Sequence, residues 1–332
     1  MRITSTGYSA SYIHTLNNIQ ESKYKSETKI TTGGETLSLA DSPKNVVNEK
    51  MLNENISRNK KYINNIEAAN TTMQASSNAI EGMIDMLYDT RTMAINSTQT
   101  SNMGNLNTLA GEMRNQIDDF IMKANTEANG AFLFAGTATN NASLTEADGT
   151  THDQPFAIVE GEPTADNPSG LKVEFYGNFK DKSINKDAAT SEVINVTADD
   201  MFGADGVEAL SALIDLYNVM AYNEDGTLRD DLDYYTTTDT AKLSDAQAKI
   251  ADLSDNLSRV NSVTGSKMNR INAIKEQMTT ENTRLNSVLT SVADTNYADA
   301  TMQLSKDKAA LEYALQVGSL IQSQNTLFDF LG

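Results

Sequence analysis

The feature that most limits what this chain can fold into is a helical repeat near its C-terminal end. Apolar residues recur there at alternating steps of three and four, which is the spacing of a coiled-coil seam. The repeat predicts one helix over residues 240–293, about 80 Å long at 1.5 Å per residue. Its fifteen positions, twelve of them apolar, are Leu243, Ala246, Ile250, Leu253, Leu257, Val260, Thr264, Lys267, Ile271, Ile274, Met278, Glu281, Leu285, Val288 and Val292.

A second seam of similar length lies near the N-terminus and predicts a helix over residues 43–100. Its positions are Ile56, Asn59, Ile63, Ile66, Asn70, Met73, Ser77, Ile80, Ile84 and Leu87. The polar members weaken such a seam but help to fix its register. Because the two seams are of nearly equal length, we expect the two helices to pair, with a shorter helix over 105–128 covering part of them.

Capping signals set the boundaries of the first long helix. Gly33-Gly34 is a plausible helix stop, Ser42 can cap the next helix, and Pro43 fits its first turn, where a missing N–H does no harm. Residues 101–105 resemble a turn, and Asn129-Gly130 is a second helix stop.

The two ends of the chain are expected to need partners. Residues 1–32 carry only sparse apolar positions, so that alone they would be poorly ordered, and residues 298–332 are helical and dense in apolar side chains. Exposed apolar surface of that extent is a liability on a monomer, which points to burial in a ring or polymer. The expected subunit-interface residues are Leu16, Ile19, Leu304, Leu311, Leu315, Ile321, Leu327, Phe328, Phe330 and Leu331.

The middle of the chain has a different pattern, with turn-forming residues and three of the four prolines. It predicts strands over 156–159, 171–176 and 193–197, and a short helix over 210–220. The apolar run at 132–134, between two glycines, is expected to be the first strand of this module or its anchor to the helices.

The fold class that follows is α+β and mainly α. It is an elongated antiparallel helical bundle or coiled coil, built by the two terminal arms, with a small β-rich module inserted between them. The expected divisions are 1–42 for an N-terminal assembly segment, 43–137 for the first bundle helices, 138–237 for the outer module, 238–296 for the C-terminal bundle helix and 297–332 for the C-terminal assembly helix.

Composition argues against several functions. A net charge of −19 disfavours binding to nucleic acid or to an anionic membrane surface. The chain has no cysteine and two separated histidines, His14 and His152, each expected to play a surface role. No nucleophile, phosphate-loop or metal motif is recognisable, and the stretch from Asn223 to Gly226 favours a turn over a calcium loop. We therefore expect no enzyme activity, no cofactor and no metal.

Four stretches carry a resemblance to the bacterial flagellin family. Residues 30–43 resemble its S-T-G … S-x-D-D-P element, although Ser42 replaces the second Asp. Residues 129–136, NGAFLFAG, are similar to the N-G-x-Y-I-F-A-G of the members found at the hook–filament junction. Residues 263–270 resemble x-x-G-A-R-x-N-R, with Lys267 in place of Arg, and residues 309–331 resemble the ending of the junction members.

The resemblance implies a structural protein of the bacterial flagellum. It implies a ring of this chain between hook-associated protein 1 and the flagellin filament, and export by the flagellar type III apparatus without a cleaved signal, assisted by an export chaperone. The product would be extracellular. The main alternative is flagellin itself, which shares both arms; an unrelated coiled-coil rod and an enzyme built on the inserted module explain less of the sequence.

Overall fold

The computed structural model describes residues 2–38, 40, 42–99, 105–140, 143–144, 149–187, 189–230 and 233–330. For residues 2–8 and 321–330 it describes the backbone alone. The chain forms two compact units. Unit 1 comprises Met1–Lys60 and Met278–Gly332, and unit 2 comprises Lys61–Gln277.

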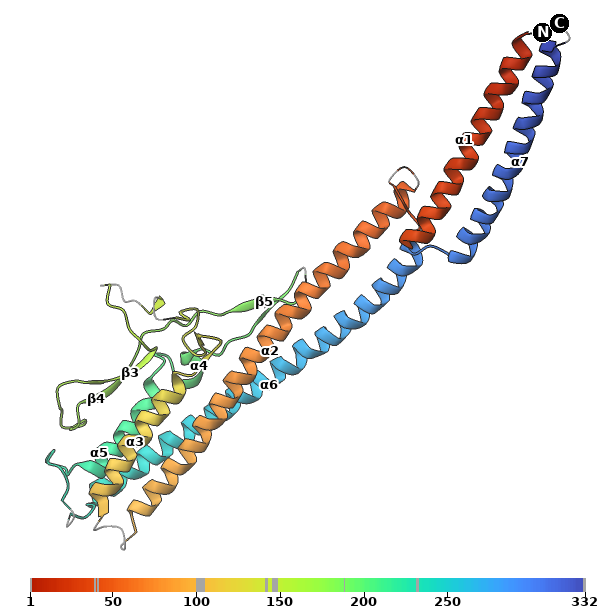
Figure 1. Cartoon of the computed structure of the whole chain (residues 1–332). Coiled ribbons are helices and arrows are strands. Elements are labelled where there is room, and N and C mark those ends of the chain that lie inside the picture. Colours follow the sequence, from red (N-terminus) through yellow and green to blue (C-terminus); the bar gives the residue numbers. More distant parts are fainter. Residues whose placement is uncertain are drawn as a thin grey trace. The chain divides into compact units, whose positions relative to one another are not determined.

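Unit 1 is built from the two ends of the chain. Helix α1 (Arg2–Thr32) packs along α7 (Tyr297–Phe330), and unit 1 also holds the beginning of α2 (Pro43–Ser97) and the end of α6 (Thr237–Ala293). The outer ends of α1 and α7 lie together (Figure 1). The partner that the sequence required for residues 1–32 is therefore the C-terminal helix of the same chain.

The helix boundaries around residue 40 follow the capping signals. Helix α1 ends at Thr32, and Gly33 takes a left-handed φ of 74° while its N–H donates to the Lys29 carbonyl at 2.8 Å. A residue with a Cβ rarely adopts that conformation, which explains the glycine. Helix α2 begins at Pro43, and the Val46 N–H donates to the Ser42 carbonyl at 3.1 Å.

In unit 2 the two predicted seams pair as antiparallel helices. Polar contacts that join α2 to α6 include Asn70 to Asn272 at 2.6 Å, Ser77 to Asn261 at 2.6 Å, and Glu67 to Lys275 at 2.9 Å. Between them lie buried seam residues such as Ile66, Met73 and Ile250. The polar positions that break the α2 repeat at Asn70 and Ser77 are thus matched across the seam, as a register-fixing role requires.

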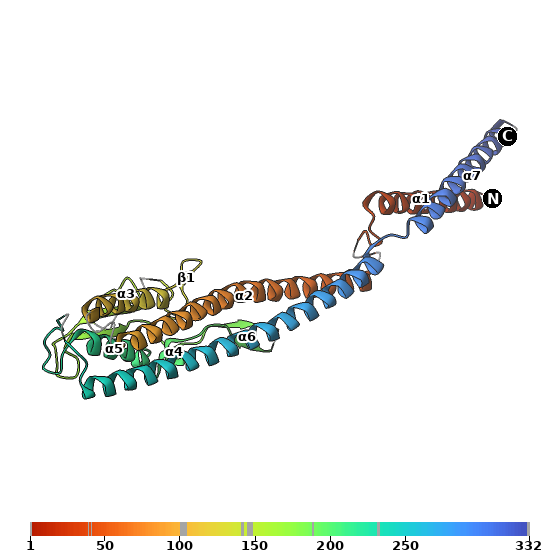
Figure 2. The ribbon, with the colours of Figure 1, turned by 90° about the horizontal axis from the view of Figure 1, so that it is seen from below.

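A second layer covers this pair of helices (Figure 2). Helix α3 (Leu106–Ala124) is bonded to α2 through Thr90 and Gln116 at 2.9 Å, and it packs against α5 (Ser211–Ala221). Helix α3 ends four residues before the predicted residue 128, because the Asn125 side chain turns to bond the backbone of Phe156 at 2.8 and 2.9 Å. The turn predicted over 101–105 lies outside the described residues, except for Asn105.

Of the apolar run at 132–134, only Phe132 lies in a strand, and Leu133 and Phe134 anchor the module in the core that it shares with the helices. Strands β1 (Glu127–Ala128) and β2 (Ala131–Phe132) form a hairpin whose two-residue loop is Asn129-Gly130, with φ of 54° and 73°. Two positive φ values are what a type I′ hairpin turn requires, and Asn-Gly is its preferred sequence. Beyond the turn, Phe132, Leu133 and Phe134 are at most 3% exposed.

The inserted module contains two further antiparallel strand pairs. Strand β3 (Phe156–Glu160) pairs with β4 (Leu171–Phe175), close to prediction, and β5 (Ser183–Asn185) pairs with β6 (Ser191–Val193). The predicted strand over 193–197 is wrong beyond its first residue. The Asn195 side chain bonds the backbone of Lys180 and Lys182, and Thr197 immediately precedes the short helix α4 (Ala198–Phe202).

The module is joined to the bundle by an aromatic core. Phe202 packs edge-on against Phe156 of β3 at 5.5 Å and against Phe120 of α3 at 6.2 Å between ring centroids. All three rings are at most 1% exposed. The 3₁₀ turn η3 (Glu208–Leu210) leads into α5, which matches the helix predicted over 210–220.

Candidate assembly surface

The α1–α7 pair is a seam of its own, with the three-four spacing on both helices. On α1 the less exposed positions include Tyr12, Leu16, Ile19, Lys23, Ser26 and Ile30, and on α7 they include Ala300, Leu304, Asp307, Leu311, Ala314 and Gly318. Most of these side chains are small or polar. The pair therefore excludes less water than the α2–α6 seam and depends more on specific contacts.

Hydrogen bonds from Tyr12 and Ser22 of α1 cross this seam to α7. The Tyr12 hydroxyl donates to the Ala314 carbonyl at 2.9 Å. The Ser22 hydroxyl donates to the Asp307 carboxylate at 2.7 Å, and Gln303 donates to the other oxygen of the same carboxylate at 2.8 Å. Asp307 is only 6% exposed, so these neutral donors satisfy a buried acid.

The base of the pair is held by a short β-bridge. The Glu35 N–H donates to the Ala293 carbonyl at 2.7 Å, and the Thr295 N–H donates to the Gly33 carbonyl at 2.9 Å. Lys29 adds an ion pair to Glu35 at 2.5 Å. The segment that follows α1 and the segment that precedes α7 are thus tied to each other.

Both terminal helices leave large apolar side chains in contact with solvent. On α7, Tyr313, Val317 and Leu320 are 68%, 49% and 62% exposed, and their spacing of four and three places them on one face. On α1, Ile13 and Tyr24 are 54% and 68% exposed. A helix pair with such faces resembles an incomplete bundle that further helices could cover.

The predicted interface residues fall into three groups. Leu16, Ile19, Leu304 and Leu311 are half-buried on the stripes where α1 and α7 face each other, and Leu315 is 56% exposed on α7. The side chains of Ile321, Leu327, Phe328 and Phe330, and all of Leu331, lie outside the described residues. A role in subunit contacts stays a prediction for all ten. Sequence reasoning missed Tyr313 and Leu320, although their helical spacing was a readable signal.

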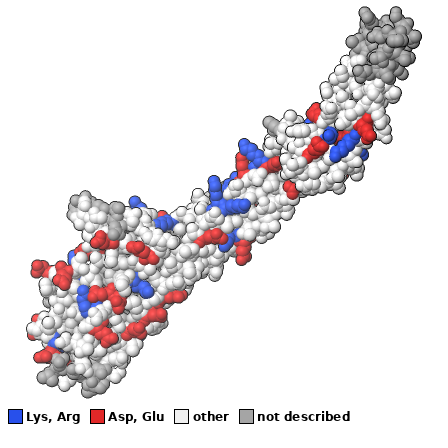
Figure 3. Space-filling model, viewed as in Figure 1, with Lys and Arg blue, Asp and Glu red and all other residues white. Residues whose placement is uncertain are grey.

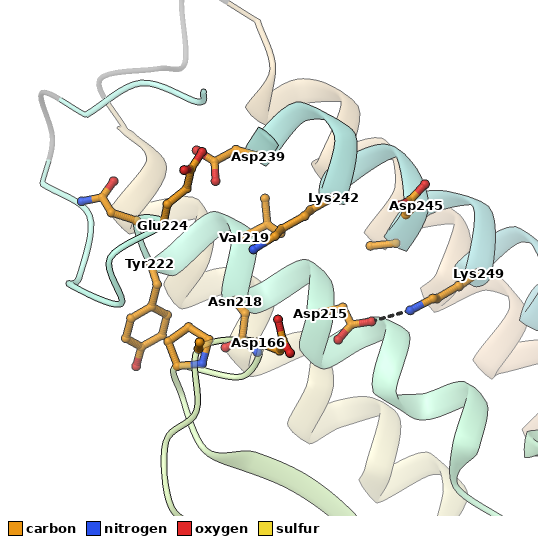
Figure 4. Close-up of a pocket in the computed structure, with 14 residues that line it drawn as sticks. Asp166, Asp215, Asn218, Val219, Tyr222, Glu224, Asp239, Lys242, Asp245 and Lys249 are labelled. Atoms are coloured by element: carbon orange, nitrogen blue, oxygen red, sulfur yellow. Dashed lines mark hydrogen bonds and ion pairs between the residues drawn. The ribbon is translucent and has the colours of Figure 1, made fainter. Parts of the chain in front are cut away.

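Several charged side chains around the pocket shown in Figure 4 are held in ion pairs. The pocket has a volume of about 200 Å³ and lies between α5 and α6. Asp215 on α5 pairs with Lys249 on α6 at 2.8 Å. Asp239 is held at 2.6 Å by the buried Arg229, whose guanidinium also lies 5.0 Å from the ring centroid of Tyr235. Burial raises the pKa of the Tyr235 hydroxyl. These charges stabilise the fold and converge on no common point.

Three further observations concern chemistry and the membrane. Across the described part of the chain, no three His, Asp or Glu side chains are grouped to hold a metal ion. His14 is exposed, whereas His152 is half-buried and its ring stacks on Tyr176 at 3.4 Å, so His152 is less of a surface residue than predicted. No helix within the described ranges has the length and apolar character needed to cross a membrane.

Charge divides unevenly along the chain. Residues 138–237 contain twenty acidic and five basic side chains, a net charge of −15 out of −19 for the whole chain. Figure 3 shows acidic side chains spread over the part of unit 2 that this module helps to build. The helical arms are close to neutral. Charge repulsion therefore opposes apolar contacts of the terminal helices only weakly.

Comparison with known proteins finds a similarity in the N-terminal helices. Residues 3–139 match the family model described as the bacterial flagellin N-terminal helical region. The N-terminal arm is thus similar to the N-terminal helical region of bacterial flagellins. The matched region contains α1, α2 and α3 and ends just after the apolar run at 132–134. No curated protein sequence matches the chain.

Solved structures share the fold at low sequence identity. A putative flagellar hook-associated protein from Vibrio parahaemolyticus has a TM-score of 0.60 at 16% identity, over 76% of this chain and 100% of that chain. Flagellar hook-associated protein 3 from Legionella pneumophila has a TM-score of 0.55 at 11% identity, over 73% and 98%. The flagellar junction protein FlgL from the same organism has a TM-score of 0.50 at 11% identity, over 76% and 100%.

The fold of this chain is thus that of flagellar hook-associated proteins. It has long N- and C-terminal helices that pack together and a small antiparallel strand module between them. The three solved proteins are named for their place in the flagellum, and none of these names denotes an enzyme.

Proposed function

We propose that this chain is a structural subunit of the bacterial flagellum and forms the junction ring between hook-associated protein 1 and the flagellin filament. The observation that carries the proposal is the match to the flagellin N-terminal helical region combined with a fold shared with solved hook-associated and junction proteins. The terminal helices supply the means of assembly, because α1 and α7 pair within one chain and keep large apolar side chains exposed.

Flagellin is the alternative, since it would carry the same N-terminal domain. Two sequence features favour the junction protein: the FLFAG form of the apolar run and the LFDFLG ending. The fold favours it as well, since a solved protein with this fold is named a flagellar junction protein. A junction subunit would stop after a short ring, whereas flagellin would polymerise along the whole filament.

The proposal includes four binding partners and a route of export from the cell. The partners are hook-associated protein 1, flagellin, further copies of this chain and an export chaperone, and the route is the flagellar type III apparatus. The product then lies outside the cell.

Deletion of the gene tests the role. A strain without this chain should build hooks and secrete flagellin into the medium as free subunits, because the filament would have no junction from which to grow. The intact chain supplied in trans should restore filaments. A deletion strain that still grows full-length filaments would contradict the junction role, and loss of flagellin from the medium, with no other flagellin gene present, would instead favour flagellin.

A further inference from the structure

The α7 seam is interrupted twice, and each interruption is matched by one residue on α1. Asp307 places a buried carboxylate among apolar and small positions, and Ser22 on α1 donates to it. Gly318 leaves a gap in the side chains of α7, and the phenol ring of Tyr12 fills it. The two matches lie ten residues apart on α1 and eleven apart on α7.

The contact at Gly318 is close enough that any larger residue would force the Tyr12 ring to move from its observed position. A Cβ at position 318 would lie 2.2 Å from the Tyr12 hydroxyl oxygen and 2.8 Å from the ring carbon that bears it. Glycine within a helix is otherwise unfavourable relative to alanine. The approach of Tyr12, which allows its hydroxyl to reach the Ala314 carbonyl, gives the glycine a structural reason.

The contact at Asp307 is equally selective for a different reason. A carboxylate at 6% exposure needs donors, and Ser22 supplies one from the opposite helix. If α7 slid by one helical turn, about 5.4 Å, Asp307 would leave Ser22, and a slip in one of the two directions would bring Ala314 to Tyr12 in place of Gly318. No single slip can satisfy both positions, so the observed register is favoured over its neighbours.

We propose that Ser22–Asp307 and Tyr12–Gly318 are register keys, which force α1 to pair with α7 of its own chain in one alignment and so make the subunit competent to assemble. This inference rests on the proposed function for its assembly part. The register determines how the exposed residues of α1, such as Ile13 and Tyr24, stand relative to Tyr313 and Leu320 on α7. A slipped subunit would keep unit 2 folded but present a different outer face to its neighbours.

A cross-linking assay tests the register without reference to the flagellum. The chain has no native cysteine, so Ser22→Cys with Asp307→Cys provides a single pair for a short thiol-specific cross-linker. In this background Tyr12–Gly318 is the remaining key, and most of the monomer should cross-link internally. Adding Gly318→Leu should lower the cross-linked fraction at least threefold. Adding Tyr12→Ala as well should restore most of it, because the small side chain at position 12 then leaves room for the large side chain at position 318.

The matched control is Ser305→Leu, which adds the same side chain at an exposed position of α7 and should leave cross-linking unchanged. Circular dichroism of each variant checks that the helices remain. An unchanged cross-linked fraction with Gly318→Leu, or failure of Tyr12→Ala to restore it, would overturn the register keys.

The assembly part is tested in cells with otherwise native sequence. Gly318→Leu should reduce the amount of this chain recovered with isolated flagella at least fivefold, and Tyr12→Ala with Gly318→Leu should recover it. Normal recovery of Gly318→Leu would refute a role for register in assembly. Absence of the wild-type chain from flagella would instead refute the proposed function, and the cross-linking result would still decide the register.

Discussion

Glu192 of β6 forms an ion pair with Arg270 of α6 and a second one, at 3.0 Å, with Lys186 of the same hairpin. Its side chain is 7% exposed, so the carboxylate is buried between two cations from different elements. Arg270 is the last residue of one of the flagellin-like stretches in the sequence. In this structure it ties the β5–β6 hairpin to the helical bundle.

Loss of either partner should therefore loosen the hairpin. Arg270→Ala is expected to cost about 1–2 kcal/mol, less than a fully buried pair, because Arg270 itself is half-exposed and Lys186 remains. Thermal unfolding and protease cleavage within residues 183–193 measure the effect. Arg284→Ala is the matched control on the same helix, since its ion pair with Glu281 is open to solvent and the change should have a much smaller effect. Equal effects of the two variants would argue against the anchoring role.

Gly136 is a second position on which the module depends, because the backbone of another segment lies very close to it. Its φ is 66°, and a Cβ there would lie 1.9 Å from the Asn178 carbonyl oxygen. Gly136→Ala should destabilise unit 2 by about 2–4 kcal/mol, through the left-handed backbone and the clash together. Gly130→Ala isolates the first cause, because Gly130 has a φ of 73° and open space around it, and it should cost about 1 kcal/mol. Chemical denaturation of both variants compares them, and a difference near zero would mean that the Asn178 contact is not formed.

The buried pair of Arg229 and Asp239 should be the most sensitive charged contact in unit 2. Their side chains are 0% and 4% exposed at a separation of 2.6 Å. Arg229→Ala leaves a buried carboxylate without its cation and should cost about 3–5 kcal/mol. Lys249→Ala, which breaks the exposed pair with Asp215, should cost less than about 1 kcal/mol. If urea unfolding gives similar midpoints for the two variants, the buried pair contributes less than its geometry indicates.

Removal of residues 298–332 should separate folding from assembly. Helix α1 then loses its partner, whereas unit 2 keeps its whole core. We expect the shortened chain to retain the α2–α6 pair and the module, shown by protease resistance of residues 61–277, but not to enter the flagellum. Proteolysis of that region at the rate of an unfolded chain would contradict this.

A single substitution gives a finer test of the same surface. Leu311→Asp places a second charge on the α7 seam and should impair incorporation more strongly than any single substitution within 140–235, judged by the amount recovered with isolated flagella. Tyr234→Asp, at an exposed apolar residue of unit 2, is a suitable control. Normal incorporation of Leu311→Asp would argue against a requirement for the α1–α7 pair in assembly.

The long helices were predictable because their signals are local and repeated. The three-four spacing located α2 and α6, and Ser42 with Pro43 marked the start of α2 to the residue. The prediction of a helix stop at Asn129-Gly130 was wrong, because α3 ends at Ala124 and these two residues form a hairpin loop. The hairpin was not readable because its strands have only two residues each.

What could not be predicted depends on contacts between distant residues. Strand propensity alone predicted a strand over 193–197. The Asn195 side chain instead bonds the backbone of Lys180 and Lys182, a contact that propensity cannot show. The same applies to the assembly surface. Leu304 and Leu311 were evident as apolar residues, whereas the pairing of Tyr12 with Gly318 depends on the alignment of two helices about 300 residues apart in sequence.

The most direct test of the central claim is immunogold electron microscopy of isolated flagella with an antibody against residues 138–235. The junction role predicts label confined to a narrow band where the hook meets the filament, and no label on flagella from the deletion strain. Label along the whole filament would identify the chain as a filament subunit. Complete absence of label from flagella whose cells make the chain would contradict any structural role for it there.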